Sequence, residues 1–272
     1  MKPQSLVFTI YGDYVLKNRV NLTFQSLVKM MTVFGFTEPA IRAALYRMKK
    51  KGIIKEIDGR IELSPEGLKR TMEGVGRVYG EYKHHWDGKW RILVYNLGEE
   101  RRELRDSLRR ELTWLGFGSL AQSTWISPNP VDDTLKEVIS RYGSLLKERD
   151  HLFFFVATSW GDPQQIVRRC WNLSQIDQAY REFLSKWSTV DPNLDYERAF
   201  ITKLTLVHEY RKFLNIDPML PQELLPEDWI GYRAHELFVS LYSKLAPKAD
   251  EYFTSMVKSK DKVSQTRLRQ EG

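Results

Sequence analysis

Cationic side chains gather on one predicted helix between Thr37 and Gly52, and their chemistry suits a polyanion. The outward positions of this helix are Glu38, Arg42, Tyr46, Lys49 and Lys50, with Arg47 at the edge of the buried face. The planar fork of arginine matches the O6 and N7 acceptors of guanine, whereas a lysine ammonium acts as a point charge toward phosphate. Arg42 lies in the early turns and is the predicted base reader, and Lys49 and Lys50 are predicted to hold phosphates.

The elements around this helix are predicted from spacing and turn residues. A first helix covers 4–17, a second begins at Thr23, and a third begins with Thr37 as its N-cap. Two short apolar runs then flank Asp58-Gly59, a strong signal for a two-residue hairpin, and Ser64 opens a fourth helix. This order of elements predicts a winged helix-turn-helix, in which the third helix enters the major groove of DNA.

The predicted DNA-binding set follows from that geometry, with one more cation beside the hairpin tip for the minor groove or the backbone. The set is Thr37, Arg42, Tyr46, Arg47, Lys49, Lys50 and Arg60. A cluster of cations at a helix C-terminus is equally typical of a solvated face that complements the helix dipole. The order of the elements and the hairpin favour DNA over this alternative.

The distribution of charge supports the same interpretation. Residues 1–87 carry fifteen Lys/Arg against nine Asp/Glu, a net charge of +6, whereas residues 88–187 carry +2 and residues 188–272 carry −1. Almost all of the excess positive charge of +7 therefore lies in the N-terminal third. This asymmetry predicts a polyanionic partner for that third and an ordinary surface elsewhere.

Strands and helices alternate in the centre of the chain. Predicted strands cover 89–97, 119–127 and 151–159, and predicted helices cover 99–115, 132–142 and 163–171. This alternation favours an open α/β sandwich of the ferredoxin type. From Ser174 the chain is predicted to be helical, with a charged end over 258–272 that frays. The sequence thus predicts an α+β protein with domains over 1–80, 88–173 and 174–272 and a hinge over 78–88.

Three stretches of the chain resemble the PaaX family of bacterial transcriptional repressors. They read AIRAALYRMKKKGII in the predicted groove-binding helix, GKWRILVYNLGEERRELRDSLRRELTWLGFGSLAQSTWISP in the centre and LVHEYRKFLNIDPMLPQELLPEDWIGYRAHELFVSLY near the end. The last is the most specific, because a helix ending YRKF and followed by DPxLPxELLPxDW is not a generic helical pattern. Arg42 and Arg47 fall where the family pattern places arginines.

The resemblance implies an N-terminal winged helix, a central ferredoxin-like domain similar to a small CRISPR-associated nuclease, and a C-terminal helical domain. It also implies a homodimer that binds double-stranded operator DNA, represses the genes of phenylacetate breakdown and leaves the DNA when phenylacetyl-CoA binds. An acyl-CoA effector of this kind has phosphates and a thioester carbonyl. His208 and Arg211 lie one turn apart on a predicted helix and are the candidate effector-binding pair, with a buried polar network as the alternative role.

An enzyme built on the central region is the competing hypothesis. Metal-dependent cleavage of nucleic acid needs carboxylates for Mg²⁺, and the nuclease-like pattern places an acid near the end of the first strand. That neighbourhood holds Asn96, and the nearest acids, Glu99 and Glu100, open the next helix. The adjacent pair His84-His85 has no further ligand at metal spacing, and Cys170 has no base beside it. No catalytic residue, metal site or cofactor is therefore predicted.

The sequence also bears on the compartment. No uninterrupted apolar stretch approaches the roughly 20 residues of a membrane helix, and Tyr11, Gly12 and Asp13 interrupt the apolar start. Cys170 is the only cysteine, so an intrachain disulfide is impossible and a reducing compartment is favoured. The prediction is a cytoplasmic protein with no membrane segment.

Overall fold

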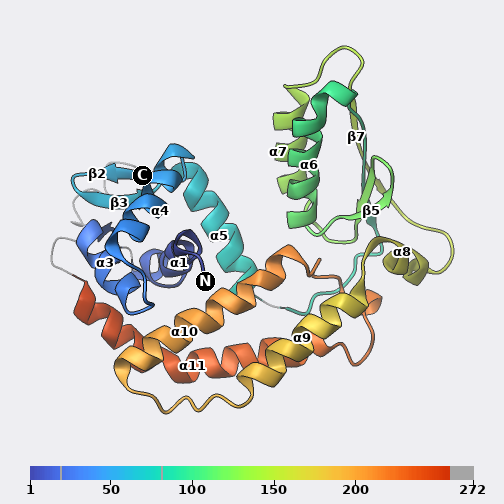
Figure 1. Ribbon diagram of the computed structural model, residues 1–272. Coiled ribbons are helices and arrows are strands. Elements are labelled where there is room, and N and C mark those ends of the chain that lie inside the picture. Colours follow the sequence, from blue (N-terminus) through green and yellow to red (C-terminus); the bar gives the residue numbers. More distant parts are fainter. Residues whose placement is uncertain (19, 81, 258–272) are drawn as a thin grey trace. The chain divides into compact units, whose positions relative to one another are not determined.

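The computed structural model describes residues 1–18, 20–80 and 82–257. Helices and strands are mixed along these residues and the last part is helical, which confirms the α+β class with a helical C-terminal region (Figure 1). The first compact unit contains Met1–Gly80, Ser185–Arg211 and the residues from His235 onward, and the second contains Glu81–Leu184 and Lys212–Ala234. The end predicted to fray, 258–272, lies outside the described residues.

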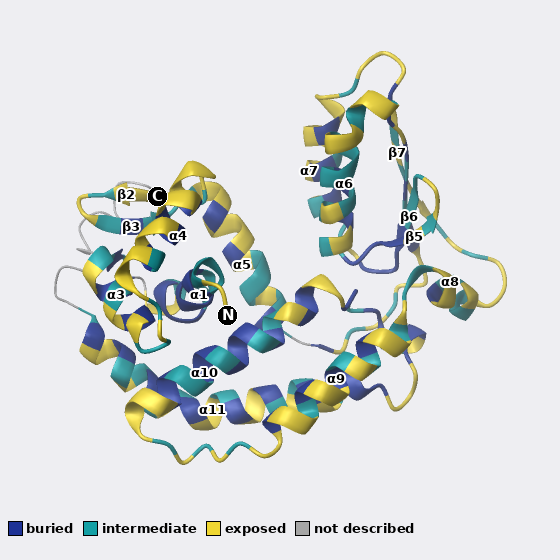
Figure 2. Cartoon of the chain, in the orientation of Figure 1, coloured by how far each residue is buried: buried dark blue, intermediate teal, exposed yellow. Residues whose placement is uncertain are grey.

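The first unit is built around the N-terminal helix. α1, Pro3–Ile10, continues through a π-helical turn, Tyr11–Val15, into α2, Leu16–Asn18, which agrees with the predicted helix over 4–17. Three helices pack around α1, namely α3 (Phe24–Thr32), α4 (Glu38–Lys50) and α10 (Tyr196–Tyr210). Leu6, Val7 and Ile10 are fully buried as a result, and α1 is among the most buried helices of this unit (Figure 2).

The two helices after α2 begin and end as their sequences dictate. The Thr23 hydroxyl accepts a hydrogen bond from the Ser26 N–H at 3.2 Å and caps α3. α4 starts after Thr37 and ends before Gly52, whose φ of +68° favours glycine. The apolar face of α4 is buried in full and consists of Ile41, Ala44, Leu45 and Met48.

A small antiparallel sheet follows α4. β2, Ile54–Ile57, and β3, Arg60–Leu63, are joined at Asp58-Gly59, where both residues have positive φ, 51° and 73°. This is the two-residue hairpin turn that the Asp-Gly pair predicts. A two-residue strand, β1, Leu22–Thr23, was not predicted and pairs with β3 to give the order β1-β3-β2. α5, Pro65–Tyr79, then begins at Ser64, whose hydroxyl accepts from the Gly67 N–H at 3.0 Å.

A buried ion pair ties the π-helical turn to α10 and to α11, Ile230–Met256. Lys203 Nζ lies 3.0 Å from Asp13 Oδ2, and neither side chain has exposed surface. The same ammonium lies 2.6 Å from Asp250 Oδ1, and the hydroxyls of Tyr79 and Tyr242 each donate to Asp13 Oδ1 at 2.7 Å. Buried charges persist only when they are paired and hydrogen-bonded, as they are here.

The second unit contains a four-stranded antiparallel sheet in the order β5-β6-β4-β7. Its elements in chain order are β4 (Trp90–Asn96), α6 (Arg102–Trp114), β5 (Gly118–Ala121), β6 (Thr124–Ser127), α7 (Asp132–Gly143), β7 (His151–Ala157) and α8 (Pro163–Cys170). The prediction of one strand over 119–127 is wrong. The segment is a tight hairpin that reverses at Ser123, whose φ is 80°.

α6 and α7 lie side by side against one face of this sheet (Figure 1). Leu93 and Tyr95 of β4 meet Leu108 of α6 and Leu135 and Val138 of α7 in one apolar cluster. Alternate residues of a strand point to opposite faces, so Leu93 and Tyr95 both face this core. The two helices and the sheet therefore form two packed layers.

Helices make up most of the described chain after residue 172, as predicted. α9 covers Leu173–Trp187, and α10 and α11 follow. α9 and α11 each contribute residues to both compact units. The predicted domain boundaries, 1–80, 88–173 and 174–272, stay a prediction. Within the described ranges, no helix has both the length and the apolar character that crossing a membrane requires.

Candidate nucleic-acid interface

α4 presents one apolar and one polar face. Opposite its four buried residues, the predicted contact residues Arg42, Tyr46, Arg47, Lys49 and Lys50 are all exposed. Tyr46 is 68% exposed, although removing a tyrosine ring from water is favourable. An aromatic ring among cations on an uncovered helix face is suited to a partner that brings both phosphates and apolar surface.

Thr37 precedes this face and differs from Thr23 and Ser64, the N-cap residues of α3 and α5. Its backbone is extended, with φ −79° and ψ 151°, but its side chain makes no capping hydrogen bond. The side chains of Thr23 and Ser64 do cap their helices. The Thr37 side chain is exposed and is not needed to start α4, so it is available to an external group.

Arg42 has two neighbours that fix its position. Its Nη2 donates to Glu38 Oε1 at 2.7 Å, and the guanidinium carbon lies 4.4 Å from the centre of the Phe24 ring on α3. The side chains of Arg42 and Glu38 remain 66% and 52% exposed. The spacing of four residues is a sequence signal for the ion pair. The contact with Phe24 has no such signal.

The lysines at the far end of α4 approach the hairpin. Lys49 Nζ lies 3.3 Å from Glu56 Oε2 on β2, and both side chains are at least half exposed. Exposed ion pairs of this kind contribute about 0–1 kcal/mol, so a phosphate group readily replaces such a carboxylate as the partner. Lys50 is exposed on the same turn. The end of α4 thus offers cations that are weakly held by the protein.

Arg60 occupies a different environment from the other predicted residues. It is half-buried at the start of β3, the central strand of the small sheet, where it pairs in register with Ile57 and with Thr23. The exposed tip of the hairpin is Asp58-Gly59. The structure therefore does not place Arg60 on the α4 face, and its contact with DNA stays a prediction.

His208 and Arg211, the candidate effector pair, both contact α1. Arg211 Nη1 donates to the Ser5 carbonyl at 3.2 Å and to the Thr9 hydroxyl at 3.0 Å, and His208 Nδ1 lies 3.4 Å from the Ser5 hydroxyl. Burial lowers the pKa of Arg211, with a smaller opposing effect of Tyr79. These contacts agree with the alternative role, a polar network that ties helices together. In the described part of the chain, no carboxylate forms an ion pair with Arg211.

A curated relative establishes the family. "Transcriptional repressor PaaX" of Escherichia coli (strain K12) is 31% identical over 261 residues, which are 90% of this chain and 81% of the relative. The chain belongs to the PaaX family. Three family models match this chain. They are described as "PaaX-like protein", which matches residues 2–63, "PaaX protein central Cas2-like domain", which matches residues 83–167, and "PaaX-like protein C-terminal domain", which matches residues 171–255. The resemblance in the three sequence stretches is thereby confirmed.

A solved structure shares the fold of this PaaX-family chain. The uncharacterized protein Rv0674 from Mycobacterium tuberculosis superposes with a TM-score of 0.60 and covers 92% of this chain and 98% of its own. The two sequences are 24% identical. Because the identity is low, this likeness bears on the fold only.

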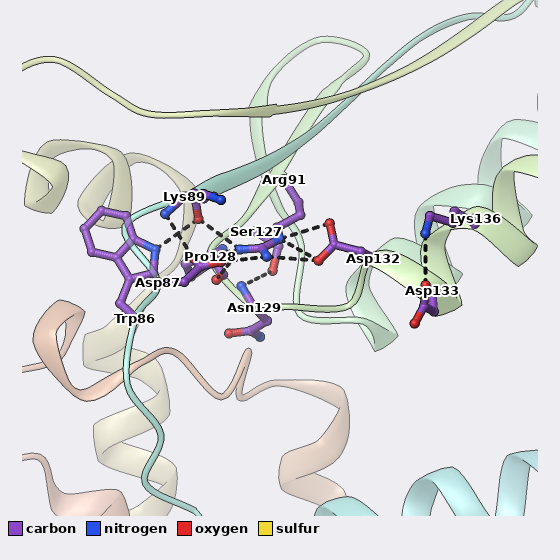
Figure 3. Close-up of polar contacts among 10 residues, drawn as sticks. All are labelled: Trp86, Asp87, Lys89, Arg91, Ser127, Pro128, Asn129, Asp132, Asp133 and Lys136. Atoms are coloured by element: carbon purple, nitrogen blue, oxygen red, sulfur yellow. Dashed lines mark hydrogen bonds and ion pairs between the residues drawn. The ribbon is translucent and has the colours of Figure 1, made fainter.

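Asp87 and Asp132, two acids near the start of β4 in the Cas2-like region, both bind Arg91. Arg91 is 4% exposed, and its Nη2 lies 2.7 Å from Asp87 Oδ2 and 2.9 Å from Asp132 Oδ2 (Figure 3). Hydrogen bonds from Arg91 are the main reason that the pKa of Asp87 is lowered, and the bond to Asp87 is the main reason that the pKa of Arg91 is raised. These two carboxylates hold an arginine and anchor the first turn of α7.

The other residues of the enzyme hypothesis are not brought together. Asn96 ends β4 as an exposed residue opposite His151. His84 Nε2 contacts Asn129 Oδ1 at 3.3 Å, whereas His85 Nδ1 contacts Glu223 Oε1 at 2.8 Å. Among the residues that the structure describes, no three His, Cys, Asp or Glu side chains cluster as metal ligands.

The Cys170 thiol is not activated as a nucleophile. Burial raises the pKa of its thiol to about 11, with a smaller lowering effect of Arg169. The thiolate is the nucleophilic form of cysteine, and at neutral pH this side chain is a thiol. This environment agrees with the absence of a base beside Cys170 in the sequence.

Proposed function

We propose that this PaaX-family protein is a DNA-binding transcriptional repressor of aromatic acid catabolism, in particular of phenylacetate breakdown. The observation that carries the proposal is the two-faced character of α4, which buries Ile41, Ala44, Leu45 and Met48 and exposes the cationic set. The relative from Escherichia coli, named a transcriptional repressor, supports it. A non-enzymatic, cytoplasmic regulator is the corresponding class.

The finer fold assignment belongs to this proposal. α3, α4, β2, β3 and α5 follow the order of a winged helix-turn-helix, with α4 as the groove-binding helix and the hairpin as the wing. The second unit has the order strand, helix, strand, strand, helix, strand in an antiparallel sheet, which is the order of a ferredoxin-like sandwich. A helical C-terminal domain completes the three-part organisation.

The proposed DNA complex places the N-terminal turns of α4 against base edges and its C-terminal turns against phosphates. Thr37 and Arg42 are then close to the bases, Tyr46 and Arg47 lie along the groove wall, and Lys49 and Lys50 reach the backbone. Arg60 contacts the minor groove or the backbone beside the wing. A homodimer binds two half-sites in double-stranded operator DNA, and each half-site alone binds weakly.

An aryl-CoA effector, phenylacetyl-CoA in the first instance, is proposed to release the repressor. Arg211 and His208 are its candidate contacts. Arg211 is a largely buried guanidinium whose described partners are neutral oxygens of Ser5 and Thr9. An anionic group that binds Arg211 competes with Ser5 and Thr9 of α1 for the N–H donors of the guanidinium. α1 in turn packs directly on α4. This gives the effector a short physical route to the DNA-binding face.

The deciding experiment measures the affinity of the purified protein for DNA upstream of the phenylacetate-breakdown genes, with and without saturating phenylacetyl-CoA. Sequence-specific binding that weakens at least tenfold with the thioester, but not with free CoA or free phenylacetate, is expected. Failure to prefer this DNA over a scrambled duplex contradicts the repressor proposal. An unchanged dissociation constant with the thioester contradicts the effector proposal only.

A matched pair of variants tests the effector contacts. Arg211→Gln is expected to remove the response to the thioester, whereas Arg198→Gln, an exposed arginine in the first turn of α10, the helix that ends just before Arg211, is expected to keep it. A thermal-shift measurement reports binding to the native state separately from DNA release. If Arg211→Gln binds and responds to the thioester as the unmodified protein does, Arg211 is not an effector contact.

A further inference from the structure

Glu38 is an unexpected acidic residue at the N-terminal end of the cationic face of α4. It occupies the first turn of α4, its side chain is 52% exposed, and it faces the same direction as Arg42 one turn later. A carboxylate at this place repels the phosphates that the neighbouring cations attract. The acid therefore opposes general DNA affinity at the point where the helix is expected to meet base edges.

Helix stability does not account for the whole arrangement. An acid in the first turn complements the helix dipole, and an exposed pair four residues apart adds a small amount of stability. Neither effect needs a third residue from another helix. Phe24 nevertheless lies under the Arg42 guanidinium at 4.4 Å, so the arginine is fixed by a carboxylate at one edge and an aromatic ring at one face.

This arrangement holds the Arg42 guanidinium in one orientation and leaves it with further N–H donors for another partner. One N–H bond of Nη2 is directed at Glu38, and the guanidinium has five N–H donors in a rigid fork. Glu38 accepts one hydrogen bond from Arg42 through Oε1, and its second carboxylate oxygen has further acceptor capacity. The pair thus offers donors and acceptors side by side.

Base edges in the major groove complement such a pair. Guanine presents the acceptors O6 and N7, which suit arginine, and cytosine presents the N4 amino donor, which suits glutamate. Residues four apart on a helix rise by about 6 Å, and stacked base pairs lie about 3.4 Å apart. Two side chains of this length and separation reach adjacent base pairs.

We infer that Glu38 is a specificity-determining residue that accepts a hydrogen bond from a cytosine amino group beside the guanine read by Arg42, and that it positions Arg42 for this contact. The inference rests on the proposed function, because it needs α4 to lie in a major groove. Glu38 also lowers the affinity for non-specific DNA, since its carboxylate repels phosphates and gains a further hydrogen bond only where a base donor faces it.

The test compares base preferences after selection from a random pool of duplexes, followed by sequencing of the bound fraction. Glu38→Gln is expected to change the preferred base at one position from cytosine to adenine, because a glutamine amide pairs with adenine N6 and N7. Glu38→Ala is expected to lose preference at that position by roughly 5- to 150-fold and to bind non-specific DNA more tightly. Asp177→Asn removes another exposed pair spaced four residues apart, Asp177–Arg181, and is the control.

The outcomes separate the inference from the proposed function. If the unmodified protein enriches a sequence and both Glu38 variants enrich the same sequence with equal strength, Glu38 does not read a base. If the unmodified protein enriches no sequence, the proposed function fails and the inference fails with it. The change of preference in Glu38→Gln cannot arise from unfolding, because an unfolded protein selects no new base.

Discussion

At the scale of single residues, the exposed cations of α4 have different expected roles. Arg42→Ala is expected to weaken operator binding by about 1–3 kcal/mol and to relax the preference at one base pair, because the guanidinium, held by Glu38 and Phe24, is the proposed base contact. Lys50→Ala is expected to weaken binding to all duplexes by a similar factor, since a phosphate contact carries no sequence information. Fluorescence anisotropy with operator and scrambled duplexes measures both effects.

The two variants serve as controls for each other. Both remove an exposed cation from the same helix, so they change the net charge equally and leave the buried face intact. A loss of affinity for operator and scrambled DNA by the same factor in Arg42→Ala would remove its role as a base reader. A changed base preference in Lys50→Ala would place that lysine among the base contacts instead.

The buried pair Lys203–Asp13 is a second feature at this scale. Lys203→Met is expected to lower the free energy of unfolding by about 3–5 kcal/mol, because Asp13 then stays buried without a cation. Burial, followed by the charge of Asp13, raises the pKa of Tyr79 and of Tyr242, so both phenols remain donors to that carboxylate. Urea denaturation followed by far-UV circular dichroism measures the loss.

A double substitution tests the electrostatic origin of this effect. Lys203→Met combined with Asp13→Asn leaves no buried charge without a partner at the centre of the cluster, so it is expected to recover a large part of the lost free energy. If the double variant is as unstable as the sum of the two single variants, lost packing rather than the unpaired charge explains the result.

At the scale of elements, the sequence predicts those with strong local signals. α4 was predictable because its apolar residues repeat at helical spacing and Gly52 supplies the positive φ after its end. The hairpin was predictable from Asp58-Gly59. β1 was not, because two residues carry no periodicity and their pairing with β3 is decided by tertiary structure. β5 and β6 were merged because Ser123 is not a typical residue at positive φ.

The candidate interface shows the same division between local and distant signals. The outward direction of Arg42, Tyr46 and Lys49 follows from helical periodicity, and the structure places all three on the exposed face. The contact of Arg42 with Phe24 depends on the packing of α3 against α4. The half-buried position of Arg60 depends on the unpredicted strand β1. Residues whose environment is set by a second element were therefore the ones that sequence reasoning could not place.

The N-caps of α3 and α4 give a matched prediction at this scale. Thr23→Ala is expected to lower the free energy of unfolding by about 1 kcal/mol, because the Thr23 hydroxyl caps α3 at 3.2 Å. Thr37→Ala removes a hydroxyl that makes no capping bond, so stability is expected to change by less than about 0.5 kcal/mol while operator affinity falls. Thermal or urea unfolding and DNA titration of both variants separate the two roles. Equal losses of stability would show that Thr37 is also a structural cap.

At the scale of the whole molecule, charge is divided between the parts of the chain. Residues 1–87, the N-terminal third, carry a net charge of +6, and residues 188–272 carry a net charge of −1. Under the proposed function, the DNA affinity that depends on release of counterions is therefore expected to come mainly from the N-terminal third. The homodimer, which the family resemblance implies and the proposed function includes, would bring two such surfaces to one duplex.

A phasing experiment tests that organisation. Two half-sites recognised by a dimer with two-fold symmetry must face the same side of the duplex, and one turn of DNA contains about 10–10.5 base pairs. Inserting about 5 base pairs between the half-sites rotates one of them to the opposite side, so affinity is expected to fall to that of a single half-site. Inserting a full turn is expected to recover more affinity than inserting half a turn, and the salt dependence for two half-sites should be about twice as steep as for one. Equal affinity for both insertions would contradict a dimer of fixed geometry, because only a flexible pair of domains or independent monomers would be indifferent to the face of the helix.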